Sequence, residues 1–271
     1  MNLQFDHVIH YVDAPKEVQN DLNQQGFHCV YGGRHEQRGS YNTLLHFGLS
    51  YIEYLGIDDF EKFKEAGAQD VTYSPFSTIA SDSFKEGFAK ICIRTTHLEE
   101  LAETFKAKGL NVNGPVPLSR RQPDGKLLEW SLLFVGDENS DLPLPFFIDW
   151  HQSDEQREQS LRNSGVIANN ANQHLQIQQI DMAVRDVKET ARNWSEWFEL
   201  DLSDVEYDED LHANVQTLHL PGVHVRFAEP VQDGKAKQVL SDRGERPFQL
   251  HLKGSDQEDQ WLLHDGYYKF I

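Results

Sequence analysis

The chain contains the same pattern twice at a constant displacement, and this repeat limits its fold more than any other feature. FDHVIHYVDAPKEVQNDLNQQGF, from Phe5, and FAKICIRTTHLEELAETFKAKGL, from Phe88, both read as strand, turn, amphipathic helix and a glycine before the next strand. Phe5 to Phe88 and Gly26 to Gly109 are each displaced by 83 residues, a register that chance copies of a helix pattern rarely keep. The sequence therefore predicts a duplicated module.

Each module is predicted to be a βαβββ unit, which makes the chain an α+β protein. A short helix over residues 14–25 follows the first strand, and aromatic and β-branched runs between turn residues predict the later strands. These strands are expected at 27–31, 41–47 and 51–57, with a break at Gly32 and Gly33, and in the second module at 127–135 and 144–150, after a turn at 123–125. Residues 58–86 are predicted to connect the two modules.

The rest of the chain repeats the pattern in weaker form. A polar stretch, 151–173, is predicted to be a linker, and a third copy begins at His174 with a hairpin around Pro221 and Gly222. FQLHLKG and WLLHDGYYKFI predict the strands of a shortened fourth unit, and the acidic stretch 201–212 is expected to be a solvated loop. We therefore expect paired modules in 1–152 and a degenerate, structural or interface part in 174–271.

The charge and the cysteines limit partners and compartment. The formal net charge is −19, with 44 acidic against 25 basic residues, and such a surface repels nucleic acid and anionic membranes. We find no apolar run of about 18 residues, no leader peptide and no CxxC motif, so the sequence predicts a cytoplasmic protein without a membrane span. Because exposed edge strands pair between chains, a homodimer is also expected.

His7 is the residue that most needs an explanation, because it stands in the middle of an apolar strand, FDHVIHYV. A strand histidine is often satisfied by a carboxylate or a backbone carbonyl, and that interpretation stays open. The modules also close alike, with SYIEY in the first and PFFIDW in the second, so Asp149 is expected to stand where Glu53 stands.

The stretches FDHVIHYV, GGRHEQRGSYNTLLHFGLSYIEYLGI, RRQPDGKLLEW and PFFIDWHQ give the chain a resemblance to the vicinal oxygen chelate superfamily, and within it to the glyoxalase-like domain proteins. The resemblance covers roughly residues 3–152, while the remainder is similar only through its βαβββ pattern. It implies that two modules pair into a half-open barrel around a divalent metal, which acts on a substrate that chelates it through neighbouring oxygens. The ligands of such proteins commonly come from the first and last strands of each module.

Carried over to this sequence, the resemblance makes His7 and Glu53 the metal ligands of the first module. An imidazole with a carboxylate suits Zn²⁺, Mn²⁺, Fe²⁺ or Ni²⁺. In the second module the matching residues are Lys90 and Asp149, and a lysine repels a metal. Asp149 is then a third ligand, or Lys90 neutralises the two carboxylates without a metal or contacts an anionic ligand.

In the third copy the positions matching His7 and Glu53 are Gln179 and Arg226, which indicates a structural part or an interface. Several other side chains are expected near the cavity. Each of them also has a purely structural interpretation, as part of a solvated turn, an exposed basic pair or core packing. These residues are Arg34, His35, Asn42, Arg120, Arg121, Trp130 and Trp150. His10 is expected to point away from a site shared with His7.

Two functions of different classes follow from these residues. One is a divalent-metal-dependent lyase, isomerase or dioxygenase acting on a small oxygen-rich substrate, with Glu53 or Asp149 as the base if it is not bound to the ion. The other is a non-catalytic protein that binds or sequesters a small molecule in a metal-free pocket. The departure at Lys90 favours the second function, and the pairing of His7 with Glu53 favours the first.

Overall fold

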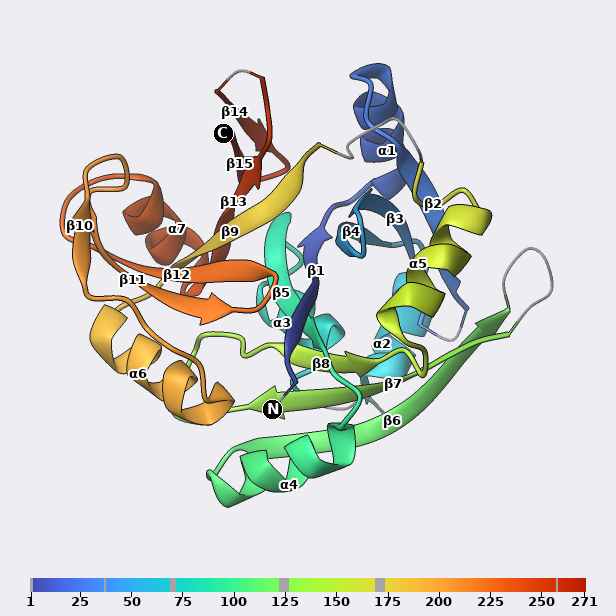
Figure 1. The fold of residues 1–271 in the computed structure, drawn as a ribbon, viewed down its shortest axis with the longest axis horizontal. Coiled ribbons are helices and arrows are strands. Elements are labelled where there is room, and N and C mark those ends of the chain that lie inside the picture. Colours follow the sequence, from blue (N-terminus) through green and yellow to red (C-terminus); the bar gives the residue numbers. More distant parts are fainter. Residues whose placement is uncertain (1, 37, 69–71, 122–126, 169–173, 257) are drawn as a thin grey trace.

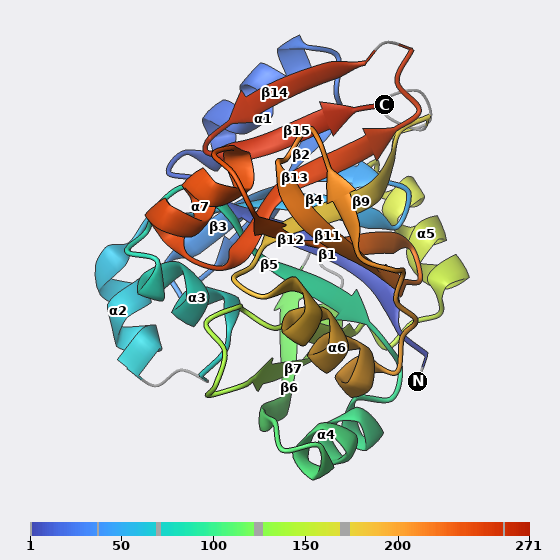
Figure 2. The same cartoon turned by 90° about the vertical axis from the view of Figure 1, so that its left-hand side faces the viewer.

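The computed structural model describes residues 2–36, 38–68, 72–121, 127–168, 174–256 and 258–271. Its strands form two mixed sheets, seen from two directions in Figures 1 and 2. Sheet A contains β1 (Gln4–Tyr11), β2 (Cys29–His35), β3 (Ser40–Phe47), β4 (Ser50–Ile57), β5 (Gly87–Arg94), β6 (Asn111–Arg121), β7 (Leu127–Gly136) and β8 (Phe146–Asp149). Sheet B contains β9 (Gln176–Ala183), β10 (Glu206–Asp208), β11 (Ala213–Leu220), β12 (Val223–Pro230), β13 (Arg246–Lys253), β14 (Asp259–Leu263) and β15 (Gly266–Phe270). The helices are α1 (Pro15–Gln24), α2 (Phe60–Ala68), α3 (Pro75–Ser81), α4 (Leu98–Ala107), α5 (Asp154–Asn163), α6 (Val187–Phe198) and α7 (Lys235–Arg243).

Sheet A consists of two βαβββ modules joined along their first strands. Its order is β2-β3-β4-β1-β5-β8-β7-β6, so β1 and β5 lie at the centre and pair antiparallel. In each module the first strand also pairs in parallel with the last, β1 with β4 and β5 with β8. The duplicated module is confirmed, and the sheet curls into the expected half-open barrel (Figure 1).

Sheet B repeats this arrangement in a reduced form. Its order is β10-β11-β12-β9-β13-β15-β14, in which β9, α6 and β10 to β12 make the third module. The fourth unit consists of β13, β14 and β15, which lie together at the top of Figure 2. The shortened fourth unit is therefore confirmed, while the acidic stretch 201–212 contains the short strand β10 as well as loop.

The break expected at Gly32 and Gly33 is wrong. β2 continues through both glycines to His35, with a register shift between Tyr31 and Gly33. A Cβ atom at Gly32 would collide with Oδ1 of Asn42 on the neighbouring strand β3. The glycine therefore lets β2 pass close to the Asn42 side chain rather than turn the chain.

The linker expected at 151–173 is also partly wrong, because it contains α5. Ser153 and Gln156 form a capping box at the start of this helix, a signal that the sequence carries as S-x-x-Q. Arg157 is its buried residue, so the helix lacks the apolar stripe by which helices are usually recognised. The connector between the modules, 58–86, contains helix α3 after helix α2. The turn predicted at 123–125 lies outside the described residues.

One apolar core draws on both sheets. It contains Phe5 and Val8 of β1, Ile180 of β9 and aromatic side chains of α4 and α6. The division into two domains stays a prediction, although the strands of the two sheets fall on either side of the expected boundary. No helix in the described part of the chain is both long and apolar enough to cross a membrane. The face of sheet A opposite this core remains available for a cavity.

Candidate active site

A bulge in β1 positions two neighbouring polar side chains on the cavity side of sheet A. The pairing of β1 with β5 shifts between Phe5 and His7, and both Asp6 and His7 are buried. Asp6 Oδ1 lies 2.7 Å from His7 Nδ1, and Asp6 Oδ2 accepts a hydrogen bond from Trp150 Nε1 at 3.0 Å. Because a carboxylate faces Nδ1, we assign a proton to that nitrogen, which directs Nε2 toward the cavity.

The electrostatics keep Asp6 ionised. Burial works to raise the pKa of Asp6, but the charge of Arg157 and the hydrogen bonds from His7 and Trp150 outweigh it and lower that pKa to about 2. The Arg157 guanidinium lies 3.8 Å from the Trp150 ring centroid. Helix α5 therefore supports the polar end of the site through one buried side chain.

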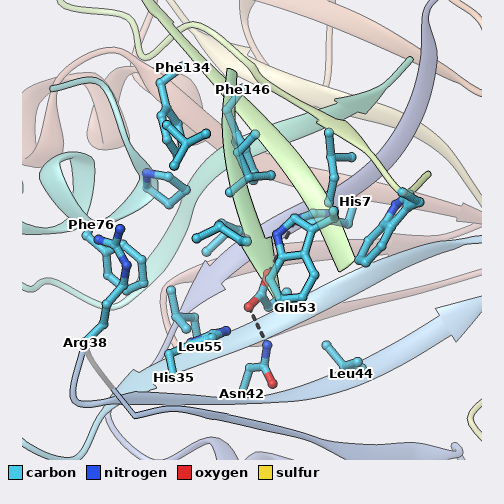
Figure 3. A pocket seen from close by; sticks show the side chains of 18 of the residues that line it. His7, His35, Arg38, Asn42, Leu44, Glu53, Leu55, Phe76, Phe134 and Phe146 are labelled. Carbon is cyan, nitrogen blue, oxygen red and sulfur yellow. Dashed lines mark hydrogen bonds and ion pairs between the residues drawn. The ribbon is translucent and has the colours of Figure 1, made fainter. Parts of the chain in front are cut away.

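Glu53 of β4 faces His7 across the site. Its Oε2 lies 3.4 Å from His7 Nε2, and its Oε1 accepts a hydrogen bond of 2.6 Å from Asn42 Nδ2 (Figure 3). Burial works to raise the pKa of Glu53, but hydrogen bonds and charge from His7, with smaller effects of His35 and Asn42, lower it. Burial works to lower the pKa of His7, but Tyr51, Cys92 and Asp6 raise it well above the usual value. Without an ion, the two side chains form a buried ion pair.

These polar groups open into a cavity of about 150 Å³, mostly apolar, on the concave side of sheet A. Strands β1, β4, β6, β7 and β8 line it with aliphatic and aromatic side chains, including Trp130 and Trp150. An apolar cavity of about this size holds a benzene-sized molecule. The site is therefore suited to a small, largely apolar compound that carries a few oxygen atoms near His7 and Glu53.

Two further side chains from the β2–β3 region reach the cavity at its other end. His35 lines it and lies 3.0 Å, through Nδ1, from the hydroxyl of Ser40. Arg38 also lines it, with its guanidinium 5.0 Å from the Phe76 ring centroid, as Figure 3 shows. Arg34 instead pairs with the exposed carboxylate of Asp58. The structure thus brings His35 and Asn42 to the cavity, as the sequence predicts.

The second module does not supply the side chains that were expected from it. Asp149 lies outside the cavity lining and accepts a hydrogen bond of 2.8 Å from the His151 backbone N–H. The strand register explains this, because Ile9 pairs with Glu53 in the first module and its counterpart Cys92 pairs with Phe146 in the second. Phe146, rather than Asp149, therefore stands where Glu53 stands.

Lys90 is buried, but it turns away from the carboxylates. Its Nζ donates a hydrogen bond to the Tyr73 backbone carbonyl, and burial lowers the pKa of Lys90 to about 7. Lys90 is not among the cavity-lining residues, so the expected pairing of Lys90 with Glu53 or Asp149 is not what the structure shows. The side chains of Arg120 and Arg121 lie outside the described part of the chain.

The donor atoms of the first module fit a divalent metal ion. Among the described residues, the buried Nε2 of His7 has no hydrogen-bond partner, and a Glu53 oxygen lies beside it. Metal-bound histidines commonly bond a carboxylate through the other ring nitrogen, as His7 does with Asp6. Cys92 adds a third donor near Asp6 and His7, within 4.8 Å, but burial raises the pKa of its thiol to about 11. The fit therefore rests on His7 and Glu53.

Asp6, Cys92, Arg157 and Arg38 are among the residues of this site that the sequence did not identify. The sequence did not predict Asp6 as a site residue, because regular alternation along β1 would place its side chain on the face opposite His7. His10 was expected to point away, and it does: its ring nitrogens lie 2.6 Å from the Tyr268 hydroxyl and 2.9 Å from the His264 carbonyl. Regular alternation along β1 thus places the two histidines on opposite faces of sheet A.

Comparisons with known proteins agree with this architecture. The profile of the glyoxalase-like domain family matches residues 5–198. A hypothetical protein from Staphylococcus aureus has the same fold, with a TM-score of 0.81, 22% sequence identity and 99% of each chain covered. A mutant 4-hydroxymandelate synthase from Streptomyces coelicolor gives a TM-score of 0.58 at 11% identity, over 93% of this chain and 71% of that one. No curated protein sequence matches. The chain belongs to the glyoxalase-like domain family of the vicinal oxygen chelate superfamily.

Proposed function

We propose that this protein is a metal-dependent enzyme of the glyoxalase-like type, in which His7 and Glu53 hold a divalent ion such as Zn²⁺, Mn²⁺, Fe²⁺ or Ni²⁺. The observation that carries the proposal is the buried Nε2 of His7, which faces the cavity beside Glu53 without a hydrogen-bond partner among the described residues. A buried polar atom of this kind is costly unless something binds it. The fold shared with 4-hydroxymandelate synthase places an enzyme among the structural relatives.

The side chains of the cavity define what such an enzyme does to its substrate. A bound divalent ion supplies an electrophile for neighbouring substrate oxygens. Asp6 fixes the His7 ring, Asn42 fixes Glu53, and the apolar walls exclude water from the bound compound. Glu53 is the carboxylate among the described lining residues, so a proton removed from the substrate would pass to a Glu53 oxygen that is not bound to the ion. This favours a lyase or isomerase whose reaction begins with proton removal beside a carbonyl.

A second candidate is a metal-free binding protein. Its support is that the buried charges already balance, since His7 and Arg157 offset Asp6 and Glu53. At the positions where the second module would supply further ligands, it has Phe146 and Lys90, and Lys90 donates its hydrogen bond to the Tyr73 backbone carbonyl. On this alternative, the cavity encloses a small apolar compound and Glu53 accepts a hydrogen bond from it.

Metal analysis combined with thermal unfolding tests the proposal. The purified chain is assayed for bound metal, and Zn²⁺, Mn²⁺, Fe²⁺ and Ni²⁺ are titrated against wild type, His7→Ala, Glu53→Gln and the exposed control His97→Ala. An ion at a hundred times its Kd stabilises by about 2.7 kcal/mol, which raises the Tm by roughly 5–10 °C. We expect the full rise in wild type and His97→Ala, and a smaller rise in the other two. An equal rise in all four proteins would exclude His7 and Glu53 as ligands, and no rise in wild type would favour the metal-free alternative.

A further inference from the structure

The face of sheet B that corresponds to the cavity face of sheet A carries a row of polar side chains on four adjacent strands. His219 of β11 pairs with His224 of β12, His224 pairs with Gln179 of β9, and Gln179 pairs with His251 of β13. Residues directly paired in neighbouring strands point to the same side of a sheet. Three imidazoles therefore lie in one row.

The strand pairing shows which row of sheet A this is. In the first module, Tyr51 of β4 pairs with His7 of β1, and His7 pairs with Cys92 of β5. In sheet B, Gln179 occupies the place of His7, as the sequence predicts. His224 of β12 then stands where Tyr51 stands, and His219 of β11 stands where His46 of β3 stands. Both histidines of sheet B are exposed to solvent.

His219 and His224 have a geometry that matches chelation of one ion. Their Nδ1 atoms lie 3.3 Å apart, and their rings are nearly perpendicular, at 86°. A tetrahedral zinc ion with Zn–N bonds of about 2.0–2.1 Å holds two ligand nitrogens roughly 3.3–3.4 Å apart. Without an ion, one of these Nδ1 atoms donates a hydrogen bond to the other, and a bound ion would take the place of that shared proton.

The surroundings favour a bound cation as well. Partial burial and the neighbouring His219 lower the pKa of His224, which favours the neutral, metal-binding form of that imidazole. The formal net charge of −19 raises the local concentration of cations around the whole molecule. Imidazole nitrogen is a ligand that zinc, copper and nickel accept readily.

We propose that His219 and His224 chelate one divalent transition-metal ion, of the zinc type, on the exposed face of the β11–β12 hairpin. The ion links the two strands of this hairpin, with water or a further ligand in its remaining positions. The turn of the hairpin contacts the first module, because the Pro221 carbonyl accepts a hydrogen bond of 2.8 Å from the Phe5 backbone N–H. A stiffer hairpin therefore braces β1 immediately before Asp6 and His7.

Zinc binding to the full chain tests this site separately from the cavity. Wild type, His7→Ala, His219→Ala, His224→Ala and the control His97→Ala are dialysed against micromolar Zn²⁺, and the bound metal is measured. We expect His219→Ala and His224→Ala each to lose one zinc equivalent that His7→Ala and His97→Ala retain. Loss of a supporting residue commonly weakens a metal site by 10–100-fold, so removal of a ligand should weaken it at least about tenfold.

The outcomes separate this site from the proposed active site. A wild-type zinc content that neither hairpin variant lowers would overturn the hairpin site, and so would wild-type binding weaker than millimolar. Loss of a different equivalent in His7→Ala concerns the cavity alone. Because His219 and His224 are exposed, their variants should melt within about 1 °C of wild type without zinc. If either alanine variant fails to fold, His219→Gln and His224→Gln give the same test with a conserved side-chain volume.

Discussion

Both sheets hold charged groups on their central strands, with Arg226 standing where Glu53 stands and Asp181 where Ile9 stands, but the two sheets bond these groups differently. On sheet B, Asp181 accepts hydrogen bonds from Arg226, Gln249 and Gln179, and His251 Nε2 lies 2.7 Å from it. On sheet A, the buried Nε2 of His7 has no such bond within the described part of the chain and faces a cavity. A polar network that is fully bonded stabilises a fold, whereas an incomplete one leaves binding capacity for a ligand. We therefore assign a structural role to the Asp181 network and a functional role to the His7 site.

The largest expected effect follows from removal of the Asp181 charge. Asp181→Asn puts a neutral amide at the buried centre of the network and leaves the half-buried Arg226 with Asp208 as its carboxylate partner. Loss of one partner from a buried pair costs about 3–5 kcal/mol of unfolding free energy. Denaturant unfolding at pH 7 measures it, with the exposed pair member Asp233→Asn as the control. A loss below about 1 kcal/mol would mean that the network of sheet B is not a stabilising element.

A smaller loss, about 2 kcal/mol, is expected at Asp6, and it depends on pH. The pKa of Asp6 falls from 3.8 to about 2 in the folded protein, so its contribution is present above pH 4 and disappears as the pH falls through the folded pKa. Asp6→Asn should therefore lower the unfolding free energy at pH 6 and lose this deficit near pH 2. The exposed Asp21→Asn serves as the control, and a deficit that does not change with pH would contradict the ionised state of Asp6.

The next effect concerns the support that α5 gives to the cavity face. Arg157→Gln removes the guanidinium from the Trp150 ring and from the neighbourhood of Asp6, which should cost about 1 kcal/mol. It should also raise the pKa of Asp6, because Arg157 is the main charge that lowers it. NMR titration of the Asp6 carboxyl measures this, against Arg162→Gln on the exposed side of α5. Equal titration curves in both variants would show that α5 does not act on the site.

The sequence predicts several of the residue positions on which this contrast depends, and the positions that it does not predict have physical explanations. His7, Glu53, Gln179 and Arg226 occupy the strand positions that the repeat predicts, because pairing within a module is local. Asp149 does not occupy its predicted position, because the loop before the last strand is longer in the second module than in the first. The distance of a residue from the end of its strand therefore does not give its strand register. Arg157 was missed for another reason: its docking depends on the tertiary position of Trp150, which no local pattern encodes.

The smallest stability effect is expected at Glu53, where the consequence for binding is greatest. Glu53→Gln removes one partner of His7, but Nδ1 of that imidazole keeps the Asp6 carboxylate at 2.7 Å, so no unpaired charge stays buried. Arg226 of sheet B differs, because Asp181→Asn removes the carboxylate that accepts two of its hydrogen bonds, and a guanidinium keeps its proton. We therefore expect an unfolding free energy within about 1 kcal/mol of wild type, together with loss of metal or ligand binding in calorimetry. A stability loss as large as that of Asp181→Asn, with binding retained, would make the His7–Glu53 pair a structural element and remove the difference between the two sheets.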